Sequence, residues 1–102
     1  MDDIRDKAKI ASSLLKGLAN EHRLIILCEL VQEEKNVTSL IEATNIPQTS
    51  MSQHLNKLKE EGIVTFRRDH RTLYYSICNP HILDIMNILY KAFCNNDEEQ
   101  RS

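Results

Sequence analysis

Residues that interrupt regular secondary structure are scarce in this chain. Its 102 residues include only two glycines and two prolines. Sandwiches and barrels of many strands need frequent tight turns, which depend on such residues. The length is also close to that of one common domain, so a second independent core has no room. We therefore expect a single domain that is mainly helical.

The first half of the chain predicts three helices. Over Asp2–Leu18, apolar residues recur at spacings of three and four, which is typical of an amphipathic helix. Asn20 is a favourable N-cap for a second helix that extends to about Gln32. This second helix is apolar on more than one side, so we expect it at the centre of the fold. Thr38 is the expected cap of a short third helix, which Asn45 ends in a left-handed conformation.

A fourth helix is predicted directly after Pro47, with Gln48 or Thr49 at its capping position. Gly62 is expected to end it. Three apolar residues of this helix recur at spacings of four and three and are expected to face the core: Met51, Leu55 and Leu58.

The hydrophobic period changes after this helix. Residues 63–68 and 72–78 alternate in a way that predicts two strands, and the charged tip 69–71 joins them in a hairpin. Pro80 then opens a last helix, whose apolar stripe runs to Phe93. The sequence therefore places a short helix, a turn, a second helix and a hairpin in direct succession, which is the order of a helix-turn-helix with a wing.

The outer side of the helix after Pro47 is polar but uncharged. An ordinary exposed helix carries Glu and Lys, whereas hydroxyl and amide side chains can reach base edges and phosphates in a major groove. The alternative is a capping region that only starts a helix. The outward residues in question are Gln48, Thr49, Ser50, Ser52, Gln53 and Asn56.

The net charge of −2 disfavours a nucleic-acid partner, because affinity for phosphate comes mostly from Lys and Arg. The charges are unevenly distributed, however. Residues 48–71 hold five basic and three acidic side chains, so this segment carries +2 and the remainder −4. A small excess of this kind is often only a solvated face. Next to the polar helix side, it favours DNA recognition.

Several segments, in this order and at these separations, resemble the ArsR/SmtB family of winged-helix repressors: Asn20–Leu24, Thr49–Val64, Arg67-Arg68 and Tyr74–Ile77. The resemblance implies a mainly α-helical winged helix-turn-helix with a small β-hairpin. Residues 1–95 would bind DNA and dimerise, and residues 96–102 would be a flexible polar tail. It further implies a homodimer held by the first and last helices, whose two recognition helices enter successive major grooves of an inverted-repeat operator.

The expected DNA-contacting residues belong to the fourth helix and to the hairpin. Those on the helix are Gln48, Thr49, Ser50, Ser52, Gln53, His54 and Asn56, and those on the hairpin are Arg67, Arg68, His70 and Arg71. A competing interpretation is a winged helix used only for protein association, which predicts no consequence when the three arginines are neutralised. A DNA-binding activator or an anti-silencer is a further alternative.

The inducer of such a regulator is expected to be something other than a metal ion. Where metal-sensing members of the family carry a Cys-Val-Cys cluster, residues 37–42 contain no thiol. The last helix offers His81 and Asp84 near its start, but residues 89–93 contain no His or carboxylate. Zinc requires four N, S or O ligands. We expect no metal and no cofactor, and a metal-responsive repressor is kept as the alternative.

Two cysteines, Cys28 and Cys94, resemble those of the thiol-switch branch of the family, which senses persulfides or oxidants. The resemblance implies that a reactive sulfur species or an oxidant bridges them and releases the DNA. The alternative is a buried inert thiol and a fraying helix end. Cys78 departs from this two-cysteine pattern. We expect it to pack at the strand end, with a role as a resolving thiol as the alternative.

Nothing in the sequence predicts an enzyme. The chain contains no glycine-rich phosphate loop, no nucleophile elbow and no paired His and carboxylate at metal-site spacing. Its longest apolar run, Leu24–Cys28, is far shorter than the ~20 residues of a membrane span. The acidic start lacks the order of a secretory signal. We expect a cytoplasmic protein with no membrane association and with its three cysteines as thiols.

Overall fold

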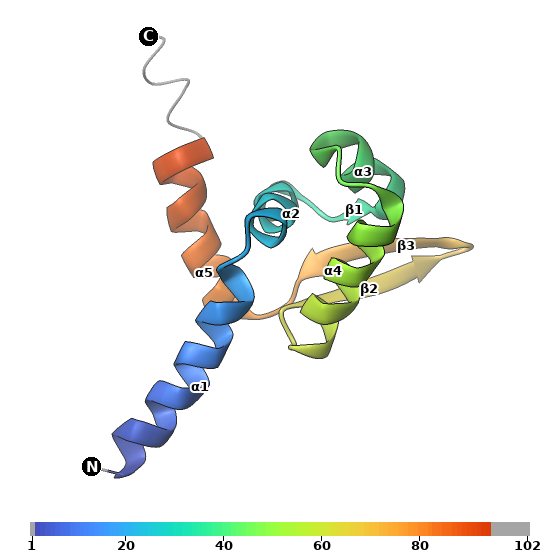
Figure 1. Ribbon diagram of the computed structural model, residues 1–102. Coiled ribbons are helices and arrows are strands. Elements are labelled where there is room, and N and C mark those ends of the chain that lie inside the picture. Colours follow the sequence, from blue (N-terminus) through green and yellow to red (C-terminus); the bar gives the residue numbers. More distant parts are fainter. Residues whose placement is uncertain (1, 95–102) are drawn as a thin grey trace, which may run out of the picture.

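The computed structural model describes residues 2–94, and the side chains of residues 3–93. The helices and a small sheet are arranged around α2 (Figure 1). The elements are α1 (Asp2–Leu18), α2 (Glu21–Gln32), β1 (Lys35–Asn36), α3 (Val37–Thr44), α4 (Gln48–Glu60), β2 (Val64–Asp69), β3 (Thr72–Ile77), α5 (Pro80–Leu89) and the π-helical turn η1 (Tyr90–Cys94). The expected tail, residues 96–102, lies outside the described residues.

Asparagine side chains cap the starts of α2, α3 and α5. Asn20 caps α2 as predicted, because its Oδ1 accepts a hydrogen bond from the backbone N–H of Arg23 at 3.1 Å. The predicted cap of α3 is wrong: Asn36, not Thr38, occupies that position and accepts from the N–H of Ser39 at 2.8 Å. An amide two residues earlier thus satisfies the free donors of the first turn, and α3 begins sooner than predicted.

The two ends of α4 differ from each other. Pro47 is its N-cap residue and no side chain caps the helix, so the prediction of Gln48 or Thr49 as the cap is wrong. Proline pre-sets the backbone at this entry point, and both residues lie inside the helix. After the helix, Gly62 adopts a φ of +74°, which favours glycine. Asn45 has the predicted left-handed conformation after α3, with a φ of 61°.

The sheet has three antiparallel strands in the order β1-β3-β2. The predicted hairpin is confirmed, with Arg67 opposite Tyr74 and Phe66 opposite Tyr75. A two-residue turn closes it, in which His70 has a φ of 59°. Strand β1 was not predicted; its two residues pair with the central strand, so that Asn36 lies opposite Tyr74. We refer to β2, β3 and their turn as the wing.

The core surrounds α2, as predicted. This helix contacts α1, α3, α5 and β3. The predicted inward residues of α4 are all buried. The buried apolar side chains are Leu18, Ile26, Leu27, Leu30, Leu40, Ile46, Met51, Leu55, Leu58, Ile63, Val64, Tyr75, Ile82 and Met86. Helices α3 and α4 with the hairpin behind them form a winged helix-turn-helix, which confirms the predicted fold class.

Helix α1 projects away from the rest of the molecule (Figure 1). Its C-terminal residue Leu18 is buried, but Ile4, Ile10 and Leu15 are 67%, 71% and 52% exposed. The predicted apolar stripe of the last helix is buried at Ile82 and Met86. At its far end, Phe93 is 74% exposed. The first and last helices therefore present apolar surface that this chain does not cover. Among the described residues, no helix is long and apolar enough to cross a bilayer.

Candidate nucleic-acid interface

Helix α4 exposes the polar side that the sequence predicts. Met51, Leu55 and Leu58 are at most 1% exposed, and their burial fixes the rotation of the helix. As a result, most of the polar residues face solvent. Gln48, Thr49, Ser52, Gln53 and Asn56 are exposed, whereas Ser50 and His54 are partly buried.

The exposed polar side chains of α4 have no internal partners. Within the described part of the chain, no side chain of Gln48, Thr49, Ser52, Gln53 or Asn56 takes part in a hydrogen bond or an ion pair. No carboxylate lies on the first three turns of the helix. These amides and hydroxyls therefore remain available to donors and acceptors outside the chain, such as the edges of bases in a major groove.

His54 has a different environment, because it meets α2. Its ring lies edge-on to that of His22, with 5.4 Å between the ring centroids. Burial lowers the pKa of His54 below its ordinary value of 6.5, and the positive charge of His22 and Arg23 lowers it further. Arg23 is itself anchored to α1, because its Nη1 donates to the carbonyl of Gly17 at 3.2 Å. His54 thus lies where α4 meets α2, at the edge of the polar face.

The wing carries the basic residues that the sequence predicts, in two kinds of environment. Arg68, His70 and Arg71 are exposed, and the only recorded partner of these three within residues 3–93 is Asp69, 3.7 Å from His70. Arg67 is paired instead. Its Nε lies 2.9 and 3.0 Å from the two carboxylate oxygens of Glu34, and its Nη2 lies 2.5 Å from one of them.

The pairing of Arg67 includes a residue that the sequence analysis missed. Glu34 precedes β1, 33 positions before Arg67, and β1 was itself not predicted. Arg67 also lies over the ring of Tyr74, 4.6 Å from its centroid. The hydrogen bond with Arg67 lowers the pKa of Glu34, and the same bond raises that of Arg67. Glu34 lies close to Arg67 only because β1 pairs with β3. No local sequence signal could therefore identify it as the partner.

The cysteines lie in three settings. Cys28 is partly buried on the central helix α2. The backbone of Cys94 belongs to η1, a turn that contacts α2, but the Cys94 side chain lies outside the described residues. Cys78 is exposed, so the prediction that it packs at the strand end is wrong. The chain leaves β3 at this point, and the thiol donates a hydrogen bond to the carbonyl of Gly62 at 3.5 Å.

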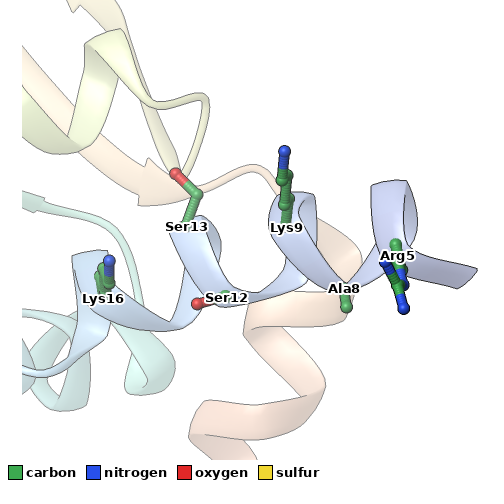
Figure 2. Close-up of a pocket in the computed structure, with 6 residues that line it drawn as sticks. All are labelled: Arg5, Ala8, Lys9, Ser12, Ser13 and Lys16. Atoms are coloured by element: carbon green, nitrogen blue, oxygen red, sulfur yellow. The ribbon is translucent and has the colours of Figure 1, made fainter.

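Neither a metal-ligand cluster nor an enclosed small-molecule pocket accompanies this polar face in the described residues. Among the described residues, no group of three or more His, Cys, Asp or Glu side chains could hold a metal ion. The depression in Figure 2 lies along α1, and its lining residues all come from that helix. They are Arg5, Ala8, Lys9, Ser12, Ser13 and Lys16. With no second element as an opposite wall, this surface does not enclose a small molecule.

Comparisons with known proteins agree with this arrangement. Residues 20–65, which span α2, α3, α4 and the start of β2, match the model of the bacterial regulatory protein, arsR family. The biofilm growth-associated repressor of Xylella fastidiosa is 33% identical over 96% of this chain and 86% of its own length. The chain belongs to the ArsR family.

Three other comparisons extend over nearly the whole chain. The transcriptional activator HlyU of Vibrio cholerae is 30% identical over 96% of this chain and 91% of its own length. The structure of reduced HlyU from the same species superposes with a TM-score of 0.87 at 31% identity, covering 92% of this chain and 99% of that one. A homodimeric winged helix-turn-helix DNA-binding domain from Mycobacterium bovis has a TM-score of 0.78 at 28% identity, over 97% and 92% of the two chains.

Membership of the ArsR family settles the class of this protein. It is a DNA-binding transcriptional regulator and not an enzyme, as predicted from the sequence. The similarity to the Xylella repressor and to HlyU also places the chain with these two regulators within the family.

Proposed function

We propose that this ArsR-family regulator is a repressor that reads its operator with the exposed polar side of α4. The observation that carries the proposal is that five amide and hydroxyl side chains face solvent there with no partner among residues 3–93. Hydrogen bonds to base edges specify a sequence, whereas contacts with phosphates fix the position on the duplex. We assign these roles to Gln48, Thr49, Ser50, Ser52, Gln53 and Asn56, with His54 at the edge of the face.

The wing supplies the positive charge in this proposal. Arg68, His70 and Arg71 extend into solvent near the hairpin tip, where they can reach phosphates or a minor groove. Arg67 was predicted among these contacts, but its recorded partners lie within the chain. The overall charge of −2 does not oppose DNA binding in this proposal, because the DNA contacts the basic segment 48–71 and not the acidic remainder of the chain.

The proposed functional unit is a homodimer formed through α1, α5 and η1. The support is the apolar surface that one chain leaves open, with Ile4, Ile10, Ile88 and Phe93 all at least 67% exposed. A two-fold interface would cover these residues and present two copies of α4 to successive major grooves of an inverted repeat. The homodimeric state of the related domain from Mycobacterium bovis supports the same assembly.

The proposed inducer is a reactive sulfur species or an oxidant that acts on Cys28 and Cys94. The contact between α2 and η1 supports this pairing, because it joins the two elements that carry these residues. A peroxide would convert one thiolate to a sulfenic acid, and attack by the second thiol would form a disulfide and release water. A persulfide on one cysteine would form the same bond, with release of hydrosulfide as the second thiolate attacks.

A disulfide between α2 and η1 would act on DNA binding through the dimer interface. It would join the central helix to a turn that belongs to the proposed interface, and so change the angle between the two copies of α4. A coupling free energy of ~1–3 kcal/mol corresponds to about 5- to 150-fold in affinity. We expect the reduced dimer to bind the operator tightly and the bridged dimer weakly.

Titration of operator DNA with reduced and with persulfide-treated protein tests the switch. The variants Cys28→Ser and Cys94→Ser should each abolish the difference between the two titrations, whereas Cys78→Ser should preserve it. Mass spectrometry of the intact protein would then identify the linked pair. Equal affinities before and after treatment would remove the switch and leave the DNA-binding proposal intact. Failure of the reduced protein to prefer any operator would overturn the DNA-reading role of α4.

A further inference from the structure

One ion pair crosses the whole sheet on its outer side. Arg67 on β2 lies opposite Tyr74 on β3, and its guanidinium lies over that ring. Beyond the ring it reaches Glu34, the residue that precedes β1. Because β3 is the central strand, this contact spans all three strands. We call Glu34, Arg67 and Tyr74 the cross-strand clamp.

The clamp lies on the outer face of the hairpin, opposite the face that packs against the core. Side chains alternate along a strand, so Phe66 and Tyr75 face away from Arg67 and Tyr74. On that inner face, Tyr75 is buried and the two rings lie 5.5 Å apart. Lys59 of α4 adds a contact 5.1 Å from the Phe66 ring. The wing is therefore attached on one face by the core and on the other by the clamp.

The geometry of the pair depends on arginine. Two different nitrogens of Arg67 meet the carboxylate of Glu34 while the planar guanidinium stacks on the ring. A lysine could keep the charge, but it has neither the second donor in a fixed fork nor the flat surface. The carboxylate of Glu34 also balances the positive charge of Arg67, which leaves Arg68 and Arg71 as the arginines of the wing with no partner among the described residues.

We infer that Glu34 is a positioning residue for DNA binding, which holds the wing through Arg67 and Tyr74 while Arg67 itself makes no phosphate contact. The inference rests on the proposed function, since it concerns how the wing meets DNA. Glu34 lies between α2 and β1, so the clamp joins the wing to the segment that leads into α3. The wing and the helix-turn-helix are thereby kept in one orientation for the same duplex.

The inference predicts that loss of the Glu34 carboxylate weakens operator binding, which is the opposite of what simple electrostatics predicts. Removing an acidic side chain from a DNA-binding surface reduces repulsion and ordinarily strengthens binding. For Glu34→Gln we expect weaker operator binding, by about two- to fivefold, because an exposed pair of this kind contributes modestly. The adjacent Glu33 is the matched control, because it is also exposed and has no recorded ion pair with any residue in 3–93. Glu33→Gln should leave affinity unchanged or slightly increased.

The experiment measures operator affinity over a range of salt concentrations for the full chain. Wild type, Glu34→Gln, Arg67→Gln, Arg67→Lys and the double variant Glu34→Gln/Arg67→Gln are compared, with Arg71→Gln as a reference for lost phosphate contacts. Each lost phosphate contact reduces the steepness of the fall of log affinity with log salt by about 0.9, or by about 1.8 for a symmetrical dimer that loses two contacts. A residue that only positions the wing lowers affinity without this change in slope.

We expect the two Gln variants, the Lys variant and the double variant to lose affinity to the same extent, with the wild-type salt slope. Equal losses in the single and double variants identify one shared interaction. Three results would overturn the inference: a reduced slope in Arg67→Gln, full affinity in Arg67→Lys, or tighter binding in Glu34→Gln. The proposed function fails separately, if the wild-type protein shows no operator preference at all.

Discussion

The exposed side of α4 and the wing are the two polar surfaces of the proposed DNA-binding region, yet the chain uses their side chains differently. On α4, Gln53 and Asn56 have no partner among the described residues, and the helix beneath them is fixed by buried leucines. On the wing, Arg67 is held by Glu34 and Tyr74. The comparison shows that residue type alone does not decide which groups are available to a ligand. Tertiary partners decide it.

The largest effect expected from this comparison is on stability. Leu55 of α4 is 1% exposed, whereas Leu73 of the wing is only partly buried. Replacing Leu55 by Ala should lower the free energy of unfolding by about 2–5 kcal/mol, because a cavity forms in the core. The same replacement at Leu73 deletes the same atoms and should cost clearly less. Denaturant unfolding at one fixed protomer concentration measures both.

Equal losses for the two leucine variants would contradict the distinction between a deeply buried inner side of α4 and a less buried wing. A loss at Leu73 that exceeds the loss at Leu55 would reverse it. The m-value serves as the control in both cases, since an unchanged m-value shows that the variant unfolds from a state of the same compactness.

The next effect concerns reading of bases. Gln53→Ala removes an exposed amide of α4, and a good base contact of this type contributes about 1–3 kcal/mol of discrimination. We expect operator affinity to fall by that amount per contact, with little change for unrelated DNA. Fluorescence anisotropy with both duplexes measures it. Gln32→Ala is the matched control, because Gln32 is an exposed glutamine at the end of α2 and outside the proposed interface.

A smaller effect is expected at the wing, where the proposed contacts are with phosphates and do not depend on the base sequence. Arg71→Gln should weaken binding to every duplex on the order of fivefold and lower the salt slope by about 0.9 per phosphate contact. Titrations of operator and unrelated DNA at several salt concentrations measure both quantities. An unchanged affinity for both duplexes would favour the competing interpretation, a winged helix used only for protein association.

The sequence was sufficient to predict the helices, the hairpin and the polar side of α4, because local periodicity encodes them. Asn20 and Asn45 act at helix ends as predicted, for the same local reason. It was not sufficient to predict β1, which has two residues and exists only through its pairing with β3. The contact between Glu34 and Arg67 depends on that pairing, and so no pattern within either segment could indicate it.

The smallest effect expected is a difference in pH dependence between the two surfaces. In the folded protein the pKa of His54 lies below its ordinary value of 6.5. The unfolded chain therefore takes up a proton first as the pH falls, and the free energy of unfolding should decrease from about pH 6.5 downward until the folded state is protonated too. Above that pH range His54 is neutral in both states and does not change the free energy of unfolding with pH. The pKa of Glu34 is also lowered, but from 4.5, so its contribution is present above pH 4.5 and is lost only below it.

Denaturant unfolding from about pH 2.5 to pH 8 covers both pH windows and separates them. His54→Gln should flatten the stability profile near and below pH 6.5 and leave the more acidic part unchanged, whereas Glu34→Gln should affect only the acidic part. His81→Gln provides the matched control, because His81 is an exposed histidine at the start of α5. If His54→Gln and His81→Gln gave the same profile, the contact of His54 with α2 would have no effect on stability, and α4 would depend on its buried leucines alone.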